Sequence, residues 1–209
     1  YKKSEESLKR SLEVCEKTLG PDHPDVATTL NNLAELHIVI NSDGDYTEEE
    51  ALLKRSLDIR EKSLGTDHPD VAKSLTSLGN LHIEINYLDE DSEYQKAEEL
   101  LKRALNIRET ALGPDHPDVA ESLYALGYLS SSIFFLNNGE GDYEKAETLF
   151  KRALEITKKS FGPEHRKIAN VLSEFGGMYT DLGEYDKAEP LLKRALEIQE
   201  KKLGPDRIE

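Results

Sequence analysis

Apolar residues recur along this chain with a helical period. In the segment that starts at Ala27, the apolar positions Ala27, Leu30, Leu33 and Ala34 fall on one face of a helix with about 3.6 residues per turn. In the segment 185–198 the apolar stripe is wider than one face, which indicates a helix with packing neighbours on two sides. The pattern predicts an all-α chain.

One turn motif separates the periodic segments. LGPDHPDVA at 19–27 returns as LGTDHPDVA at 64–72, LGPDHPDVA at 112–120 and, altered, FGPEHRKIA at 161–169, and a final LGPD begins at Leu203. Glycine after the last helical residue ends a helix with a positive φ. Proline suits the first turn of the next helix, where its missing N–H costs nothing. Each copy predicts helix–turn–helix, and the altered copy predicts that the last pair opens differently.

The closing glycines set the length of a repeat. Gly20, Gly65, Gly113, Gly162 and Gly204 stand 45, 48, 49 and 42 residues apart, and the turn histidines and the tyrosines that open the second helices keep the same spacing. The basic unit is therefore 42 residues, with insertions in the first three units. We expect one array of repeats over 1–209, whose parts are an unpaired second helix at 1–20, four helix pairs at 21–65, 66–113, 114–162 and 163–204, and a tail at 205–209.

Two motifs within the repeats carry a family resemblance. They are SLTSLGNLH at 74–82 and YxKAExLxKRALxI at 94–107, 143–156 and 185–198. Over its whole length the chain resembles tetratricopeptide repeat (TPR) proteins of the 42-residue, kinesin-light-chain type. The resemblance implies a right-handed α-solenoid of antiparallel helix pairs, a superhelix with about nine helices. It also implies that the helix beginning at each HPDVA is the first of its pair and lines the concave side.

The second repeat departs from the family at a close helix contact. Three residues after the opening tyrosine, later copies have the small residues Ala97, Ala146 and Ala188, but this copy has Glu49. Burying a carboxylate there would be costly. Either this junction is looser, or Ala51 packs in place of Glu49.

Composition narrows the class of partner. The chain has 209 residues, a net charge of −15 and 33% charged residues. This acidity argues against nucleic acid and anionic membranes, and it favours neutral to basic protein segments. No apolar run approaches the roughly 18 residues that span a bilayer. The chain starts at Tyr1 without methionine or a signal peptide, so we interpret it as part of a longer protein and expect it in the cytoplasm.

Candidate chemistry is sparse. The turn histidines are at least 45 residues apart and are expected on successive repeats, too far apart to share a zinc ion. The acidic insertion at 41–45 lacks the Gly and Glu of a calcium loop, because Tyr46 and Leu52 stand there. No nucleophile, zinc-hydrolase or phosphate-loop motif occurs. We therefore expect no catalytic residue, cofactor or metal, and no enzymatic activity.

The family's groove positions, applied to each first helix, give a candidate peptide-binding groove. Few of these residues are Lys, Glu or Arg, the types that fill the other exposed helix positions. Amides, hydroxyls and aromatics suit hydrogen bonding to an extended peptide, with tyrosine as an anchor. The alternative is that inner faces of tight superhelices simply prefer small residues. The set is Thr28, Asn31, Asn32, Glu35, Lys73, Thr76, Ser77, Asn80, Glu121, Tyr124, Tyr128, Asn170, Ser173 and Glu174.

We thus expect a non-enzymatic scaffold that binds an extended peptide or a partner protein in the concave groove. A second hypothesis is a regulatory or sensor segment of a larger multidomain effector, with intramolecular contacts made through the edge insertions. The third insertion carries Phe134 and Phe135, a candidate edge contact for another domain. These rings could instead pack against Tyr87 and Leu88 of the neighbouring insertion.

Overall fold

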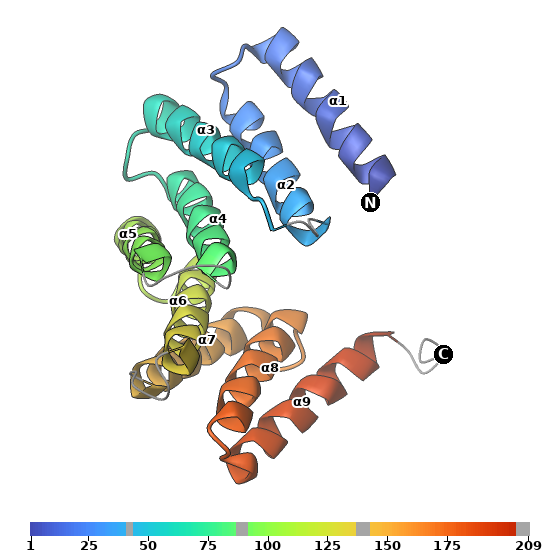
Figure 1. The fold of residues 1–209 in the computed structure, drawn as a ribbon. Helices are drawn as coiled ribbons and strands as arrows, with labels where there is room; N and C mark the ends of the chain where they lie inside the picture. Colours follow the sequence, from blue (N-terminus) through green and yellow to red (C-terminus); the bar gives the residue numbers. More distant parts are fainter. Residues whose placement is uncertain (41–43, 87–91, 137–142, 204–209) are drawn as a thin grey trace. The chain divides into compact units, whose positions relative to one another are not determined.

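The computed structural model covers residues 1–209 and describes all of them except 41–43, 87–91, 137–142 and 204–209 (Figure 1). The described residues form nine α-helices and no strand, which confirms the all-α prediction. The helices are α1 Lys2–Leu19, α2 Pro24–Ile40, α3 Thr47–Leu64, α4 Pro69–Asn86, α5 Ser92–Leu112, α6 Pro117–Leu136, α7 Tyr143–Phe161, α8 Arg166–Asp181 and α9 Tyr185–Leu203.

The chain divides into two compact units, Tyr1–Leu112 with α1 to α5 and Gly113–Glu209 with α6 to α9. Within each unit every helix packs against its neighbours in sequence. In addition, α2 contacts α4 in the first unit and α6 contacts α8 in the second. The first helices of consecutive pairs therefore lie side by side, as expected for stacked helix pairs.

The turn motif acts through backbone conformation and one side chain. Its glycines Gly20, Gly65, Gly113 and Gly162 have φ between 81° and 94°, where a side chain would be strained. The histidine that follows places Nδ1 3.1–3.3 Å from the N–H two residues later, which satisfies a free donor of the new helix. His165 makes this same cap to Lys167, so the expectation that the last pair opens differently is wrong.

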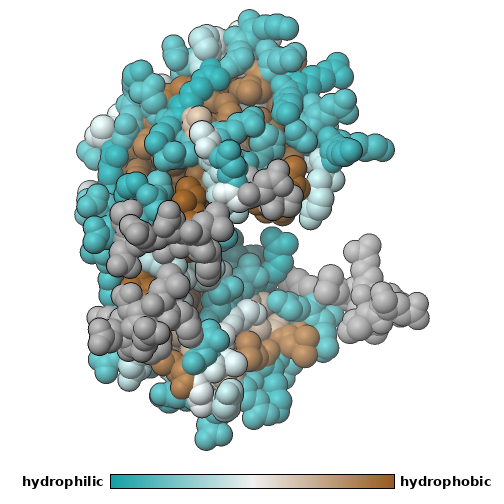
Figure 2. All heavy atoms as spheres, viewed as in Figure 1, coloured by the Kyte–Doolittle hydropathy of each residue, from teal (hydrophilic) through white to brown (hydrophobic). Residues whose placement is uncertain are grey.

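The helices of a pair approach closely where the first helix carries glycine. A Cβ built on Gly79 would lie 2.7 Å from Leu101, and one built on Gly127 would lie 2.9 Å from the ring of Phe150. The side chains of Leu101 and Phe150 are fully buried. Glycine thus lets a bulky residue of the second helix reach the backbone of the first. Apolar side chains pack between the helices, and hydrophilic ones dominate the outside (Figure 2).

At the second repeat, the small-residue position is filled by a carboxylate. Glu49 is only 5% exposed, whereas Ala51 is exposed. The alternative in which Ala51 packs in place of Glu49 is therefore wrong. Within the described part of the chain, no helix has the length and hydropathy needed to cross a bilayer.

Candidate peptide-binding faces

The predicted groove residues lie on two surfaces, one in each unit. The α2/α4 face consists of Thr28, Asn31, Asn32, Glu35, Lys73, Thr76, Ser77 and Asn80. The α6/α8 face consists of Glu121, Tyr124, Tyr128, Asn170, Ser173 and Glu174. Most of these side chains are exposed or half-buried, but Asn31, Thr76 and Ser77 are buried.

The buried members of the α2/α4 face hold the two helices together. Asn31 Nδ2 on α2 donates to Ser77 Oγ on α4 at 2.8 Å and to Glu35 Oε1 at 2.9 Å. Ser77 Oγ in turn donates to Glu35 Oε1 at 2.8 Å. Thr76 Oγ1 donates to its own helix, to the oxygen of Ala72. These polar atoms are thus engaged within the chain, and the accessible groups of this face come from its other members.

A buried arginine lies beneath this face. Arg60 of α3 is 3% exposed, and its guanidinium donates to Ser74 Oγ at 2.7 Å and to Thr28 Oγ1 at 3.2 Å. Burial lowers the pKa of Arg60, while the charges of Asp70 and Glu35 act in the opposite direction. An arginine stays protonated in proteins, so a cation fills the space between α2 and α4.

Two serines complete this polar core. Ser56 Oγ of α3 lies 2.9 Å from Ser74 Oγ of α4 and donates to the main-chain oxygen of Ala27 on α2 at 2.9 Å. Sequence reasoning missed Ser56, Arg60 and Ser74. The available signal was the Ile-Arg pair at 59–60, which returns at 107–108 and is replaced by Ile-Thr at 156–157.

On the α6/α8 face, Tyr124 of α6 and Glu174 of α8 lie close enough for each to shift the pKa of the other. Burial, followed by the charge of Glu174 and the closeness of its side chain, raises the pKa of Tyr124 to about 12, so the phenol stays protonated at neutral pH. Burial also raises the pKa of Glu174, although the nearby hydroxyl of Tyr124 acts to lower it.

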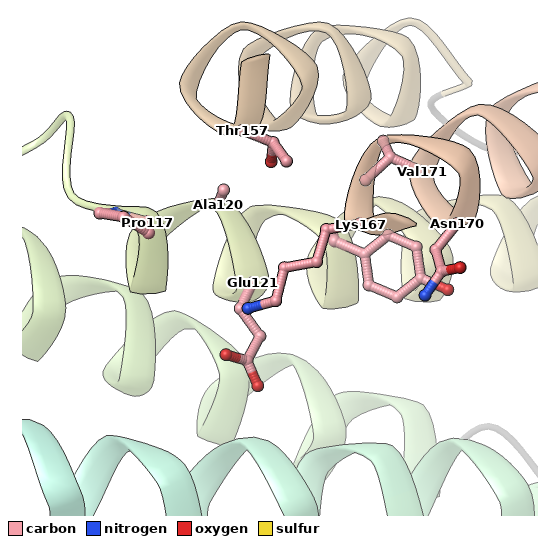
Figure 3. A pocket seen from close by; sticks show the side chains of 8 residues that line it. Pro117, Ala120, Glu121, Thr157, Lys167, Asn170 and Val171 are labelled. Carbon is pink, nitrogen blue, oxygen red and sulfur yellow. The ribbon is translucent and has the colours of Figure 1, made fainter. Parts of the chain in front are cut away.

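Next to Tyr124 the face contains a hollow of about 210 Å³ between α6, α7 and α8 (Figure 3). Its walls are largely apolar, and Glu121, Lys167 and Asn170 are its exposed members. The lining residues are Pro117, Ala120, Glu121, Tyr124, Thr157, Lys167, Asn170 and Val171.

The charges of the two faces are mostly negative or paired. Lys73 is the one basic residue among the predicted groove positions, and its Nζ lies 2.7 Å from Asp70 Oδ1. Glu35, Glu121 and Glu174 supply carboxylates.

Elsewhere, buried His82 of α4 contacts two carboxylates from neighbouring helices. Its Nδ1 lies 2.6 Å from Glu93 Oε2, and its Nε2 lies 3.8 Å from Glu50 Oε1. In the part of the chain that the structure describes, no group of three His, Cys, Asp or Glu side chains is arranged to hold a metal ion. We therefore interpret this contact as a link between helices.

The stacked pairs and their polar inner faces define a helical repeat protein. Tetratricopeptide repeat family profiles match residues 1–38, 86–131 and 135–207, and a second such profile matches 26–70. The chain therefore belongs to the tetratricopeptide repeat family, as its motifs predict. A search of curated protein sequences found no match.

Solved structures with the same fold include kinesin-light-chain-like proteins. A Podosopora anserina putative kinesin light chain with nearly identical TPR-like repeats has a TM-score of 0.61 and 24% identity, over 96% of this chain and 88% of that chain. BtubC (BKLC) from P. vanneervenii has a TM-score of 0.66 and 21% identity, over 97% and 74%. MamA has a TM-score of 0.52 and 21% identity, over 97% and 94%. At these identities the likeness shows the fold alone.

The predicted edge contact lies outside the described residues. The side chains of Phe134 and Phe135 are not described, and neither are Tyr87 and Leu88. Their role stays a prediction.

Proposed function

We propose that this protein is a non-enzymatic scaffold that binds extended peptide segments of partner proteins on two faces, α2/α4 in one unit and α6/α8 in the other. The TPR fold generally serves protein–protein interaction, which supports the class of function. One observation supports placing the binding site on these two faces. Asn32, Asn80 and Asn170 are exposed on first helices, and their side chains make no hydrogen bond within the described part of the chain.

An asparagine amide both donates and accepts, so it can pair with the N–H and C=O of an extended peptide. These pairs would hold the peptide without reading its sequence. Specificity would then come from anchors such as Tyr124 and Tyr128, which are only half-buried. At binding surfaces, a few anchoring side chains commonly contribute most of the affinity.

The charge of the peptide belongs to the same proposal. The faces carry Glu35, Glu121 and Glu174, and the net charge of the chain is −15. Both favour neutral to basic peptides over acidic ones, nucleic acid or anionic membranes. A location in the cytoplasm is part of this proposal. The regulatory alternative depends on insertions that lie largely outside the described residues, and no observation on the described residues favours it.

The test begins with peptides selected from a displayed random library and measured by isothermal titration calorimetry. The combined variant Asn32→Ala, Asn80→Ala and Asn170→Ala removes the three inner amides. It is expected to weaken binding about tenfold or more, since each net hydrogen bond contributes roughly 0.5–1.5 kcal/mol.

The matched control removes three exposed amides from second helices, as Gln95→Ala, Asn106→Ala and Gln199→Ala. This control is expected to bind like the wild type. Equal losses in the two triple variants, or no loss in the first, would contradict the proposed location.

A further inference from the structure

The hollow on the α6/α8 face stands where the first unit has a buried cation. Thr157 of α7 and Arg60 of α3 each stand five residues before the glycine that closes their helix. By the same register, Val171 corresponds to Ser74, each six residues after the turn histidine, and Ala153 corresponds to Ser56.

Three polar groups are therefore replaced together. In the first unit, the guanidinium of Arg60 spans the space from Thr28 on α2 to Ser74 on α4. In the second unit, the shorter Thr157 directs its hydroxyl to its own helix, where it donates to the oxygen of Ala153 at 2.7 Å. The space that a side chain fills in one unit is a hollow of about 210 Å³ in the other.

The polarity of the hollow changes with depth. Ala120 and Val171 are each 5% exposed, and Thr157 is 3% exposed, so methyl groups make up much of its floor. At the mouth, the side chain of Lys167 on α8 reaches toward Glu121 on α6 (Figure 3), and Asn170 is the third exposed residue of the lining. An apolar floor beneath a polar rim is the usual form of a pocket for an anchoring side chain.

We propose that this hollow is the specificity pocket of the scaffold and takes one unbranched or γ-branched aliphatic side chain, of leucine or methionine, from the bound peptide. The proposal rests on the proposed function and names the residue by which the bound peptide is anchored. A guanidinium like that of Arg60 would fit less well, because the two serine hydroxyls near Arg60 are replaced by Ala153 and Val171 and the floor offers no carboxylate. An aliphatic side chain loses no hydrogen bond on entering.

The test uses peptides selected from the displayed random library against the whole chain. We expect them to share one leucine or methionine position, and replacing it by alanine or arginine is expected to weaken binding about tenfold or more. Thr157→Met fills the hollow from its floor, so it should weaken the selected peptides to a similar extent and remove the effect of the anchor replacement.

Thr148→Met is the matched control. Thr148 is an exposed threonine on the same helix, and its hydroxyl bonds the carbonyl four residues earlier, just as that of Thr157 does. Circular dichroism and thermal melting check that both variants fold. If Thr157→Met does not fold, Val171→Leu fills the same hollow from α8 and is expected to give the same loss.

The outcomes separate the two proposals. The anchor pocket is contradicted if the selected peptides share an arginine instead of an aliphatic residue. It is also contradicted if they bind the folded Thr157→Met or Val171→Leu variant as tightly as the wild type. In that case the inner-face asparagine variant still weakens binding if the scaffold proposal is right. If no peptide is selected, or if that variant binds normally, the scaffold proposal fails and the anchor pocket fails with it.

Discussion

At the scale of single residues, Arg60 shows how a cation becomes part of the interior of a small helical unit. A buried charge is stable only when its donors find acceptors, and Arg60 finds the hydroxyls of Ser74 and Thr28. Its long side chain also fills volume that would otherwise be empty. Removing it should therefore cost packing and leave two hydroxyls with one partner fewer.

Arg60→Ala is expected to lower the free energy of unfolding by about 2–4 kcal/mol, in urea melts followed by circular dichroism. The matched control on the same helix is Arg55→Ala. Arg55 is exposed and pairs with Glu16 at 2.6 Å, a contact expected to contribute about 1 kcal/mol or less. Similar losses in the two variants would show that Arg60 is not part of the core.

Glu174 predicts a dependence of stability on pH. Because burial raises its pKa in the folded chain, the folded state keeps its proton to higher pH than the unfolded state does. Its protonated form is compatible with folding, and stability is lost as pH rises through the raised pKa. Glu174→Gln cannot ionise, yet its side chain has nearly the same size and shape.

The variant and the wild type should therefore be about equally stable near pH 3, and the variant should be the more stable one near pH 7. Denaturant melts of both proteins at the two pH values give the comparison. A variant that is less stable than the wild type at neutral pH would show that the ionised carboxylate stabilises the fold.

At the scale of elements, contacts between helices depend on where glycine stands. The ring of Phe150 on α7 is fully buried against Gly127 and stacks on Phe175 with 5.5 Å between ring centroids, so it cannot move aside easily. Gly177 on α8 is different, because a Cβ built there meets no atom within 4 Å. Alanine substitutions at Gly127 and Gly177 therefore distinguish the effect of packing from the effect of helix propensity.

Gly127→Ala is expected to destabilise the chain by about 1–3 kcal/mol through overpacking, even though alanine is the better helix former. Gly177→Ala should instead stabilise it by about 0.5–1 kcal/mol. Thermal and urea melts decide between these signs. If both variants are stabilised, the α6–α7 contact is not as close as the structure indicates.

The elements themselves follow from local signals, because Gly, His and Pro act on the backbone of their own turn. The helical period of apolar residues does not predict how deeply a side chain is buried. Asn31 and Ser77 stand off the apolar stripe, yet both are buried, since α2 and α4 meet beside α3. Arg60, which follows Ile59, is likewise buried although the helical period does not predict it. A period shows which way a side chain points, but not how near the next helix lies.

At the scale of the whole molecule, the excess of acidic residues bears on which partners approach. The net charge is −15, from 42 acidic and 27 basic residues. Long-range attraction acts on any basic peptide and weakens as salt shortens the Debye length. The inner faces add carboxylates close to the proposed peptide, so the preference should appear in equilibrium affinity as well as in association rate.

Basic variants of a selected peptide should therefore bind more tightly than acidic variants at about 20 mM salt, and the difference should shrink at about 300 mM salt. Fluorescence anisotropy titrations with labelled peptides measure both. Tighter binding of the acidic variants at low salt would contradict the proposed charge preference.

Photo-crosslinking of a selected peptide to the whole chain, with the sites read by mass spectrometry, tests the central claim most directly. A photoreactive group carried along the peptide reports which surface it touches. We expect the crosslinks on the exposed residues of the α2/α4 and α6/α8 faces, among them Asn32, Asn80 and Asn170. Crosslinks confined to the second helices, or to the insertions at 41–45, 89–93 and 137–142, would contradict the claim that the inner faces bind the partner.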